Sequence, residues 1–519
     1  MTRGADPQKA QGVASDSLPQ AGRPTAQWTQ WAYAHLLELL YPTLVAAMVA
    51  PIAIWPIPRS WDLVNHWARL TLYGMPPTDP LAALYGVKLA IIPNLAVDLV
   101  YLALSPAFSP ETVIRLAWVA SIVLPAWGAW RLNKALFAKP QPVVLLVPAL
   151  SYNLVVTIGL INFALGMGLV IHALAWWMTI DRRRFWIRIG LFNSISAVLF
   201  FCHIAAYAAL FLLVALLEAT TRSRESWRAW LWRNAQTPLH FALGAVLWLF
   251  TVPIESRFGA PGAKIAILAA PMLDDSAFLG VLETMGVALI VVAALHRRHL
   301  SLSPRIRWLL LAFGAVIVAL PSAKGAADFI DARLAVLLAY LVIASLRGPR
   351  DSSPRWCFVW LAVAIVAARA ASIAPSWSEY ARQATAFRQA IGVIAPGSRA
   401  IVIAPPMGAC PASDAQDYYK GLMNFVVIDR RALVSTLFTG KGMQPVWMLD
   451  PGMSDVPWTP PHPSWLKARD GAAGPGGSSN WRESFDTLIA LHVGCAWRPD
   501  EPGLRQVAAT PEATLYDVR

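Results

Sequence analysis

Apolar runs recur along the first 374 residues of the chain, separated by short polar segments. The first covers residues 34–55, and eleven more follow at 85–105, 111–130, 142–158, 161–179, 187–201, 203–219, 237–253, 279–296, 306–321, 331–347 and 356–374. Several are shorter than the roughly 20 residues that a helix needs to cross a bilayer at right angles, so we expect short, packed or broken helices among them. The pattern predicts a polytopic α-helical membrane domain over residues 28–374.

Polar segments flank this domain on both sides. Residues 1–27 are rich in Gly, Ala, Pro and Ser, and we predict that they form a disordered tail. Residues 375–519 carry charged residues, turn signals and short β-rich runs such as 400-AIVIAPP-406 and 424-NFVVID-429. This length is enough for one small domain, so we predict a C-terminal α/β or α+β domain.

Basic residues gather in the polar segments between the apolar runs. The clusters cover residues 131–139, 181–188, 222–233, 296–307 and 347–355. Because cytoplasmic loops of membrane proteins are enriched in Lys and Arg, these clusters and the N-terminal tail should lie in the cytoplasm. Twelve crossings contradict this arrangement, whereas about eleven satisfy it. The run at 85–105, with Lys88, Pro93 and Asp98, is the one that we expect to lie along the interface or re-enter.

Eleven crossings place the loop at 57–84 and the C-terminal domain outside the cytoplasm. In a bacterium the chain then lies in the inner membrane, with residues 375–519 in the periplasm. Cys410 and Cys495 both fall in this exported region, where a disulfide can persist. The sequence leaves their pairing open.

Composition narrows the class of protein. Hydrophobic residues make up 57% of the 519 residues and charged residues only 14%, whereas a soluble domain has about 25% charged residues. The net charge of +13 belongs to the loop clusters and not to a basic stripe with interleaved aromatic residues, so we expect membrane lipids and no nucleic acid as partners. Phosphate-binding loops, dinucleotide fingerprints and zinc signatures are absent from the sequence, and we predict neither a metal nor a cofactor.

The first candidate site follows the first apolar run, in 59-RSWDLVNHWARL-70. Asp62 and His66 are four residues apart and would share a face of a helix, with Arg69 close to the same face. A carboxylate here could accept a proton from an attacking hydroxyl group within reach of lipid headgroups. A structural interpretation fits the spacing equally well: Ser60 caps a helix and Asp62 complements its dipole.

Further polar residues adjoin apolar runs at the membrane face where Asp62 is expected. They are Asn162, His203, Glu255, Arg257, Asp331 and Arg333. Ionisable residues at such positions are costly and often functional, and an arginine suits a phosphate group, which makes Arg333 and Arg257 candidates for phosphate binding. Structural interpretations stay open: His203 ends a helix, Asp331 and Arg333 form a mutual or neighbouring ion pair, and the arginines snorkel.

Six sequence blocks carry a resemblance. They are WDLVNHWARL (61–70), PNLAVDLVY (93–101), GLINFALGMGL (159–169), CHIAAYAALFLL (202–213), DARLAVLLAY (331–340) and NFVVIDRRALVSTLFTGKGMQPV (424–446). In this order they resemble blocks in a poorly characterised group of bacterial multi-pass proteins of the GT-C type. GT-C proteins are polyprenyl-phosphate-dependent membrane glycosyltransferases, and the similarity covers roughly residues 35–450.

The resemblance implies transfer of a sugar, with inversion, from a lipid-linked polyprenyl-phosphate donor to a glycan or glycolipid acceptor outside the cytoplasm. By this resemblance Asp62 is the catalytic base, and Arg333 or Arg257 stabilises the leaving polyprenyl phosphate. His66 would tune Asp62 or bind the acceptor. The expected substrate pocket comprises Asn65, Asn162, His203, Glu255 and Asp331. The C-terminal domain would hold the acceptor.

Two other functions remain open. A transporter or flippase of lipid-linked or envelope substrates would line a pathway with the same polar residues, although the sequence shows no paired inverted halves. A non-catalytic scaffold of polysaccharide assembly would share the fold without using Asp62. The use of Asp62 in chemistry therefore separates the enzyme from both alternatives.

Overall fold

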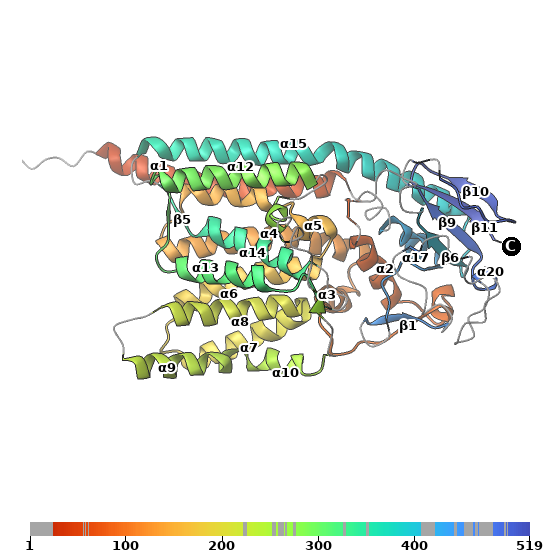
Figure 1. Ribbon diagram of the computed structural model, residues 1–519, viewed down its shortest axis with the longest axis horizontal. Helices are drawn as coiled ribbons and strands as arrows, with labels where there is room; N and C mark the ends of the chain where they lie inside the picture. Colours follow the sequence, from red (N-terminus) through yellow and green to blue (C-terminus); the bar gives the residue numbers. More distant parts are fainter. Residues whose placement is uncertain are drawn as a thin grey trace, which may run out of the picture.

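Helices dominate the computed structural model of the chain. It describes residues 24–55, 57, 59–60, 62–221, 226–251, 256–257, 264, 267–272, 277–324, 329–348, 352–405, 421–440, 444–450, 460–461, 466, 481–492, 495 and 497–518. Long helices lie side by side in one body, and a small sheet lies at one end of it (Figure 1). The predicted mainly helical fold with a small C-terminal region that contains a sheet is therefore confirmed.

Five helices among the described residues are long and apolar enough to span a membrane. They are α1 (Pro24–Ile54), α4 (Pro110–Phe137), α6 (Ile161–Thr179), α7 (Phe185–Cys202) and α15 (Ser352–Ala390). Further helices complete the body: α2 (Leu63–Tyr73), α3 (Ala96–Leu104), α5 (Leu154–Ile158), α8 (Ile204–Thr220), α9 (Trp227–Gln236), α10 (Ala242–Trp248), α12 (Ala277–His296), α13 (Arg307–Ala319) and α14 (Ile330–Ala344). The 3₁₀ helices are η1 (Pro80–Ala83), η2 (Pro142–Leu150), η3 (Thr237–Phe241) and η4 (Ile267–Ala269). The predicted count of about eleven spans is not confirmed.

The segment at 85–105 does not form a membrane-length helix. It contains β1 (Tyr85–Val87) and then α3, whose 9 residues extend about 14 Å at 1.5 Å per residue, half the thickness of a bilayer core. The predicted N-terminal tail needs a correction, because α1 begins at Pro24 and residues 24–27 are therefore helical. Residues 1–23 lie outside the described ranges.

Helices α4 and α6 pack closely against each other because glycines lie at their contact. A Cβ atom on Gly128 of α4 would lie 3.2 Å from the carbonyl oxygen of Gly168, and one on Gly168 of α6 would lie 2.9 Å from the backbone nitrogen of Pro125. Small residues let helix backbones approach in this way. Since Asn162 lies in the first turn of α6, this contact also helps to position the candidate site.

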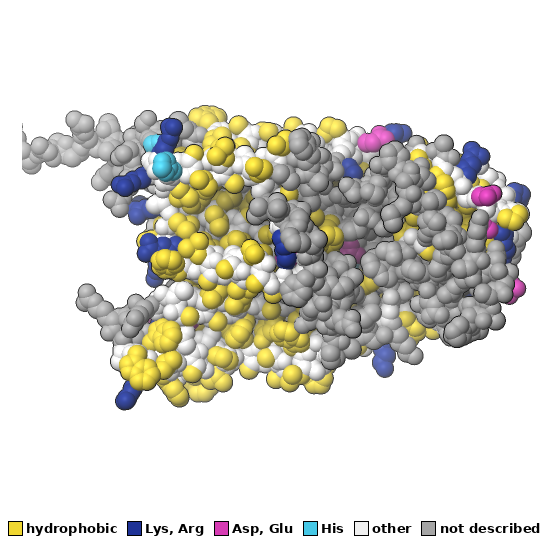
Figure 2. All heavy atoms as spheres, viewed as in Figure 1, with side chains coloured by type: hydrophobic (Ala, Val, Ile, Leu, Met, Phe, Trp, Pro, Cys, Tyr) yellow, Lys and Arg dark blue, Asp and Glu magenta, His cyan; other side chains and the backbone are white. Residues whose placement is uncertain are grey.

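The loops that carry basic residues meet at one end of the helical body. Strand β3 (Ser301–Leu302), after α12, pairs with β5 (Leu346–Arg347), after α14, and Arg182, after α6, pairs with Glu218 in α8. Figure 2 shows Lys and Arg side chains at this end, Lys and Arg mixed with Asp and Glu at the sheet end, and hydrophobic side chains along the body between the two. The sheet domain lies at the opposite end (Figure 1).

The C-terminal sheet has the strand order β10 (Arg505–Ala509), β11 (Ala513–Asp517), β9 (Thr487–Leu491), β6 (Arg399–Ile403) and β7 (Leu433–Val434). Pairs β10–β11 and β11–β9 are antiparallel, whereas β9–β6 and β6–β7 are parallel. Around the sheet lie η5 (Ile391–Val393), α17 (Phe425–Arg430) and α20 (Trp481–Ser484). Strand β8 (Val446–Met448) lies outside this sheet and pairs with β1. This pairing joins the C-terminal domain to the loop after α2.

Two expectations for this region need correction. The last helix continues through Pro375 to Ala390, so the predicted boundary at residue 375 falls inside α15. Beyond the proline, Trp377, Tyr380 and Phe387 lie at helical spacing and are all buried, and this burial stabilises the continued helix. The run at 424–429, predicted as β-rich, forms α17 instead, since its buried apolar residues pack on α2 and a short apolar run does not distinguish strand from helix.

Gly168→Ala should lower the thermal stability of the purified protein, because the added methyl group meets the backbone of α4. Overpacking of this kind costs about 1–3 kcal/mol, and thermal unfolding in detergent measures it. Gly190→Ala is the matched control: it lies in α7 with no atom within 4 Å of the added carbon, and alanine favours a helix. Equal unfolding midpoints for the two variants would contradict the packing argument.

Candidate functional site

The segment before α2 is fixed by the turn that precedes α6. The backbone N–H of Asp62 and the hydroxyl of Ser60 both donate to the carbonyl oxygen of Ile158, each over 3.0 Å. Gly159 follows with φ of +93°, and a Cβ atom there would lie 2.7 Å from the backbone nitrogen of Leu63. Only glycine fits this contact, which determines where Asp62 stands.

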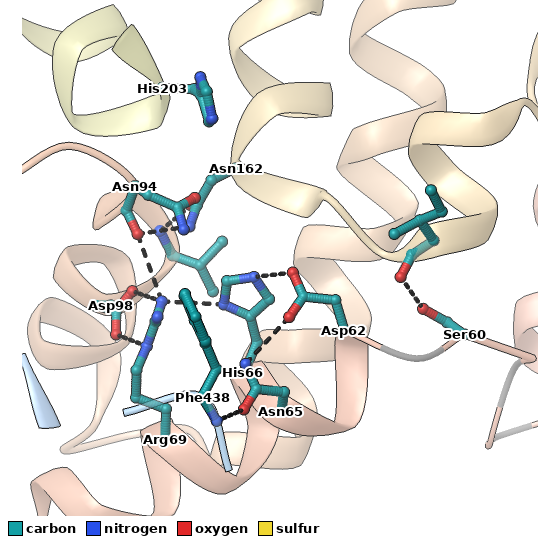
Figure 3. Close-up of polar contacts among 12 residues, drawn as sticks. Ser60, Asp62, Asn65, His66, Arg69, Asn94, Asp98, Asn162, His203 and Phe438 are labelled. Carbon is teal, nitrogen blue, oxygen red and sulfur yellow. Dashed lines mark hydrogen bonds and ion pairs between the residues drawn. The ribbon is translucent and has the colours of Figure 1, made fainter. Parts of the chain in front are cut away.

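A buried ion pair lies two turns further along α2 (Figure 3). Arg69 donates from Nε to Asp98 Oδ1 over 2.7 Å and from Nη2 to Oδ2 over 2.5 Å, and the two side chains are only 2% and 0% exposed. Tyr73 donates its hydroxyl to Asp98 Oδ1 over 2.8 Å, and burial beside this carboxylate raises the pKa of Tyr73. Because both charged groups are shielded from water, each is stabilised by its charged partner and not by solvent.

His66 connects this ion pair to Asp62. Arg69 Nη2 lies 3.0 Å from His66 Nδ1, and since a guanidinium group only donates, Nδ1 must accept. The proton of the neutral ring then resides on Nε2, which lies 3.4 Å from Asp62 Oδ2. Arg69 thereby selects the tautomer that points an N–H group at Asp62.

Asp62 is ionised and more exposed than the residues that support it. Its side chain is 29% exposed, against 2% for His66, and its Oδ1 accepts from Asn65 Nδ2 over 3.0 Å. Burial favours a raised pKa, but His66, Asn65 and Arg69 outweigh it and hold the pKa of Asp62 below its ordinary value of 3.8. A charged, partly accessible carboxylate is the result.

The capping interpretation of this segment does not describe the contacts. Asp62 occupies the N-cap position of α2, but its side chain makes no capping hydrogen bond to the helix backbone. Ser60 donates to Ile158 instead of capping the helix. The carboxylate of Asp62 is therefore hydrogen-bonded by His66 and Asn65 and caps no backbone group, although its place at the N-terminus of α2 still complements the helix dipole.

The C-terminal domain completes the group from the other side. The backbone N–H of Phe438 donates to Asn65 Oδ1 over 2.9 Å, and Gln444 Oε1 accepts from Arg69 Nη1 over 3.0 Å. Gln444 was not among the residues predicted from the sequence, and Asp98 entered the prediction only through the topology. Both lie in the blocks that carry the resemblance, which was the available signal.

Asn162 supports the ion pair from α6. It is fully buried, its Oδ1 accepts from the backbone N–H of Val97, and its Nδ2 donates to the carbonyl oxygen of Asn94, each over 2.9 Å. These bonds fix the turn that leads into α3 and hence to Asp98. Both ends of the amide serve this turn, so the geometry assigns Asn162 to positioning.

His203 and Arg333 form a second polar group. Figure 3 shows His203 beyond Asn162, on the side away from Arg69. Arg333 Nη1 lies 2.7 Å from His203 Nε2, and the backbone nitrogen of Ala205 lies 3.1 Å from His203 Nδ1. His203 is thus the N-cap of α8, as the helix-end interpretation predicts, and it faces Arg333 with its other nitrogen.

The remaining candidate residues are only partly described. Asp331 Oδ2 accepts from Lys264 Nζ over 2.5 Å and from Ser322 over 2.7 Å, so it forms a neighbouring ion pair and not one with Arg333. Glu255 lies outside the described residues. Arg257 is described only as backbone of β2 (Ser256–Arg257), which pairs with β4 (Ala323–Lys324), and its phosphate contact stays a prediction.

Cysteines, metals and relatives add little to the site. Cys495 is disulfide-bonded, and Cys410, its possible partner by sequence, lies outside the described residues. Among the described residues, no three His, Cys, Asp or Glu side chains gather as they would around a metal ion.

No protein-family model matches the chain, and no curated protein matches it. The function is therefore argued from the site itself.

Asp98→Asn should destabilise the protein strongly, because it leaves the charge of Arg69 buried without its partner. Removal of one member of a buried pair costs about 3–5 kcal/mol. Glu111→Gln is the control, since Glu111 and Arg115 form an ion pair whose side chains are 43% and 41% exposed, worth about 0–1 kcal/mol. Thermal unfolding in detergent compares them, and equally small shifts would show that the buried pair is dispensable.

Proposed function

We propose that the protein is an inverting membrane glycosyltransferase of the GT-C type, which moves a sugar from a polyprenyl-phosphate donor to a glycan or lipid acceptor outside the cytoplasm. The observation that carries the proposal is the geometry of Asp62. This carboxylate is ionised and partly exposed, while its neighbours His66 and Arg69 are buried and hold it in one orientation. Such support is typical of a reacting group.

In the proposed reaction the acceptor hydroxyl oxygen attacks the anomeric carbon from the side opposite the phosphate. Asp62 accepts the hydroxyl proton as the new C–O bond forms. The bond between the anomeric carbon and the phosphate oxygen breaks, and polyprenyl phosphate leaves with the electron pair. The lowered pKa of Asp62 keeps it charged beside the positive charge that develops on the sugar, so that it takes the proton late.

Arg333 is our candidate for the cation that stabilises the leaving phosphate, with Arg257 as the second candidate. Both ring nitrogens of His203 face N–H groups, from Ala205 and from Arg333. A neutral imidazole accepts through only one nitrogen, so one of these contacts is poorly satisfied. A phosphate oxygen that accepts from Arg333 would remove this conflict, which supports the assignment.

We further propose that the chain lies in a bacterial inner membrane with the C-terminal domain in the periplasm. The disulfide of Cys495 favours an oxidising compartment, and the basic loops lie at the opposite end, where the cytoplasm is expected. About eleven crossings stay part of the proposal, because every predicted run contains a helix, and the run at 85–105 starts with β1 and holds only the 9-residue α3. The contacts of Phe438 and Gln444 with α2 support a role for the C-terminal domain in holding the acceptor near Asp62.

Asp62→Asn should abolish transfer without removing the protein from the membrane. The amide keeps the size of the side chain but is neither charged nor a base, and loss of a general base costs about 10²–10⁴-fold in rate. The readout is mass spectrometry of lipid-linked and envelope glycans from a strain that lacks the native chain and expresses the wild type or the variant.

The matched control for this experiment is Glu111→Gln, which makes the same chemical change at an exposed carboxylate and should restore all products. If the Asp62→Asn strain makes wild-type glycans at equal expression of the protein in the membrane, the proposed glycosyltransferase activity is contradicted. The transporter and the scaffold would then be the remaining functions.

His66→Ala should move the acid limb of the pH–activity profile upward. The pKa of Asp62 lies below 3.8, so the charged form is present above that pKa and is lost as the pH falls through it. Without His66 the effect of burial prevails and the pKa rises, so activity disappears at a higher pH.

The measurement is the initial rate of transfer in membranes between about pH 3 and pH 8, with the donor that the glycan analysis identifies. His66→Gln can still donate and accept, and it should restore part of the wild-type profile. An identical acid limb in all three forms would show that His66 does not tune Asp62.

A further inference from the structure

Another polar site, separate from the group around Asp62 and from the pair His203 and Arg333, lies at the opposite end of α6 from Asn162. A cavity of about 500 Å³ is bounded by the last turns of α6 and α8 and by the loop before α13. Its lining includes Trp177, Arg182, Glu218 and Arg305. Helix α6 has 19 residues and extends about 28 Å, so this cavity is separate from the proposed transfer site.

Glu218 organises the wall of this cavity. Its side chain is 3% exposed, and it accepts from the indole of Trp177 over 2.8 Å and from Arg182 Nη2 over 2.9 and 3.1 Å. Arg233 Nε lies 3.3 Å from Oε2 of Glu218. Two guanidinium groups therefore share one carboxylate, and the group as a whole is cationic.

The cavity also presents cationic donors that are available to a ligand. Arg182 is 52% exposed and binds Glu218 through Nη2 only. Arg305 is exposed and makes no hydrogen bond or ion pair within the part of the chain that the structure describes. The lining also contains Asp181, whose Oδ1 accepts from the backbone N–H of Arg183 over 2.9 Å. Arg182, Arg233 and Arg305 still outnumber the two acids, Glu218 and Asp181. A ligand here should be anionic, and paired guanidinium groups suit phosphate.

Helix α9 marks the depth of the cavity in the membrane. Its Trp227 and Trp232 are 63% and 69% exposed, and exposed tryptophans of membrane proteins are enriched at the level of the lipid headgroups. Arg233 ties α9 to α8 through Glu218 and through the carbonyl oxygen of Thr221, over 2.9 Å. Since Thr221 lines the cavity, the cavity opens where lipid phosphates lie.

We propose that this cavity binds the headgroup of an anionic phospholipid, with Arg182 and Arg305 donating to its phosphate oxygens. Basic pockets between membrane helices bind such headgroups. The volume of about 500 Å³ lies in the range of about 300–1,000 Å³ for organic ligands and exceeds what a bare phosphate ion requires. This inference is independent of the reaction proposed for Asp62.

The test is thermal unfolding of the full chain in detergent with added phosphatidylglycerol, and with phosphatidylcholine for comparison. Phosphatidylglycerol should raise the unfolding midpoint of the wild type. Arg305→Gln should weaken the apparent affinity by about tenfold, the effect of one lost charge-assisted hydrogen bond. It should still fold, because it breaks no contact in the described part of the chain.

Arg183→Gln is the matched control, since it removes the same charge beside Arg182 but lies outside the lining; it should bind phosphatidylglycerol like the wild type. Equal stabilisation by phosphatidylcholine, or an equal loss of affinity in Arg183→Gln, would overturn the proposal as a nonspecific effect. Stabilisation by inorganic phosphate without any response to the phospholipid would assign the cavity to a soluble anion and overturn it as well.

Discussion

The ion pair between Arg69 and Asp98 is the contact on which the arrangement of the candidate site depends. Both charges are removed from water, so separating them is costly. The pair therefore fixes the position of α2 relative to α3. The guanidinium group then has donors left in fixed directions, one toward His66 and one toward Gln444. The orientation of Asp62 follows from this pair through the ring of His66.

The same group lies where the helical body meets the C-terminal domain, and both parts build it. Asn65 binds the backbone of Phe438, β1 pairs with β8, and Asp79 in the loop after α2 forms an ion pair with Arg431. Helix α15 runs from the membrane domain into the sheet domain without a break. A movement of the C-terminal domain would therefore reach α2 and Asp62, so that acceptor binding, if this domain holds the acceptor as we propose, would be coupled to the position of Asp62.

Short-range patterns predicted much of this structure, and long-range contacts explain what they missed. The apolar runs located the helices, and the four-residue spacing placed His66 against Asp62. The partner of Arg69 could not be inferred, because Asp98 is 29 residues away and Gln444 is 375 residues away. The partner of Asp331 is likewise Lys264, 67 residues away, and not the nearby Arg333. Sequence spacing shows which residues share a helix face, but only packing decides what that face meets.

The turn at 94–98 connects the two polar groups that we propose act on one substrate. Asp98 at its end holds the arginine that orients Asp62, and the backbone N–H of Leu95 donates to the carbonyl oxygen of Phe201 over 2.7 Å, two residues before His203. Asn162 fixes this turn from α6, and the next residue, Phe163, packs edge-on against the ring of His203 at 5.5 Å. A transfer with inversion requires the base and the phosphate-binding cation on opposite sides of the sugar. One rigid turn that positions Asp62 through Arg69, and Arg333 indirectly through His203, would keep that geometry whatever sugar is bound in the proposed reaction.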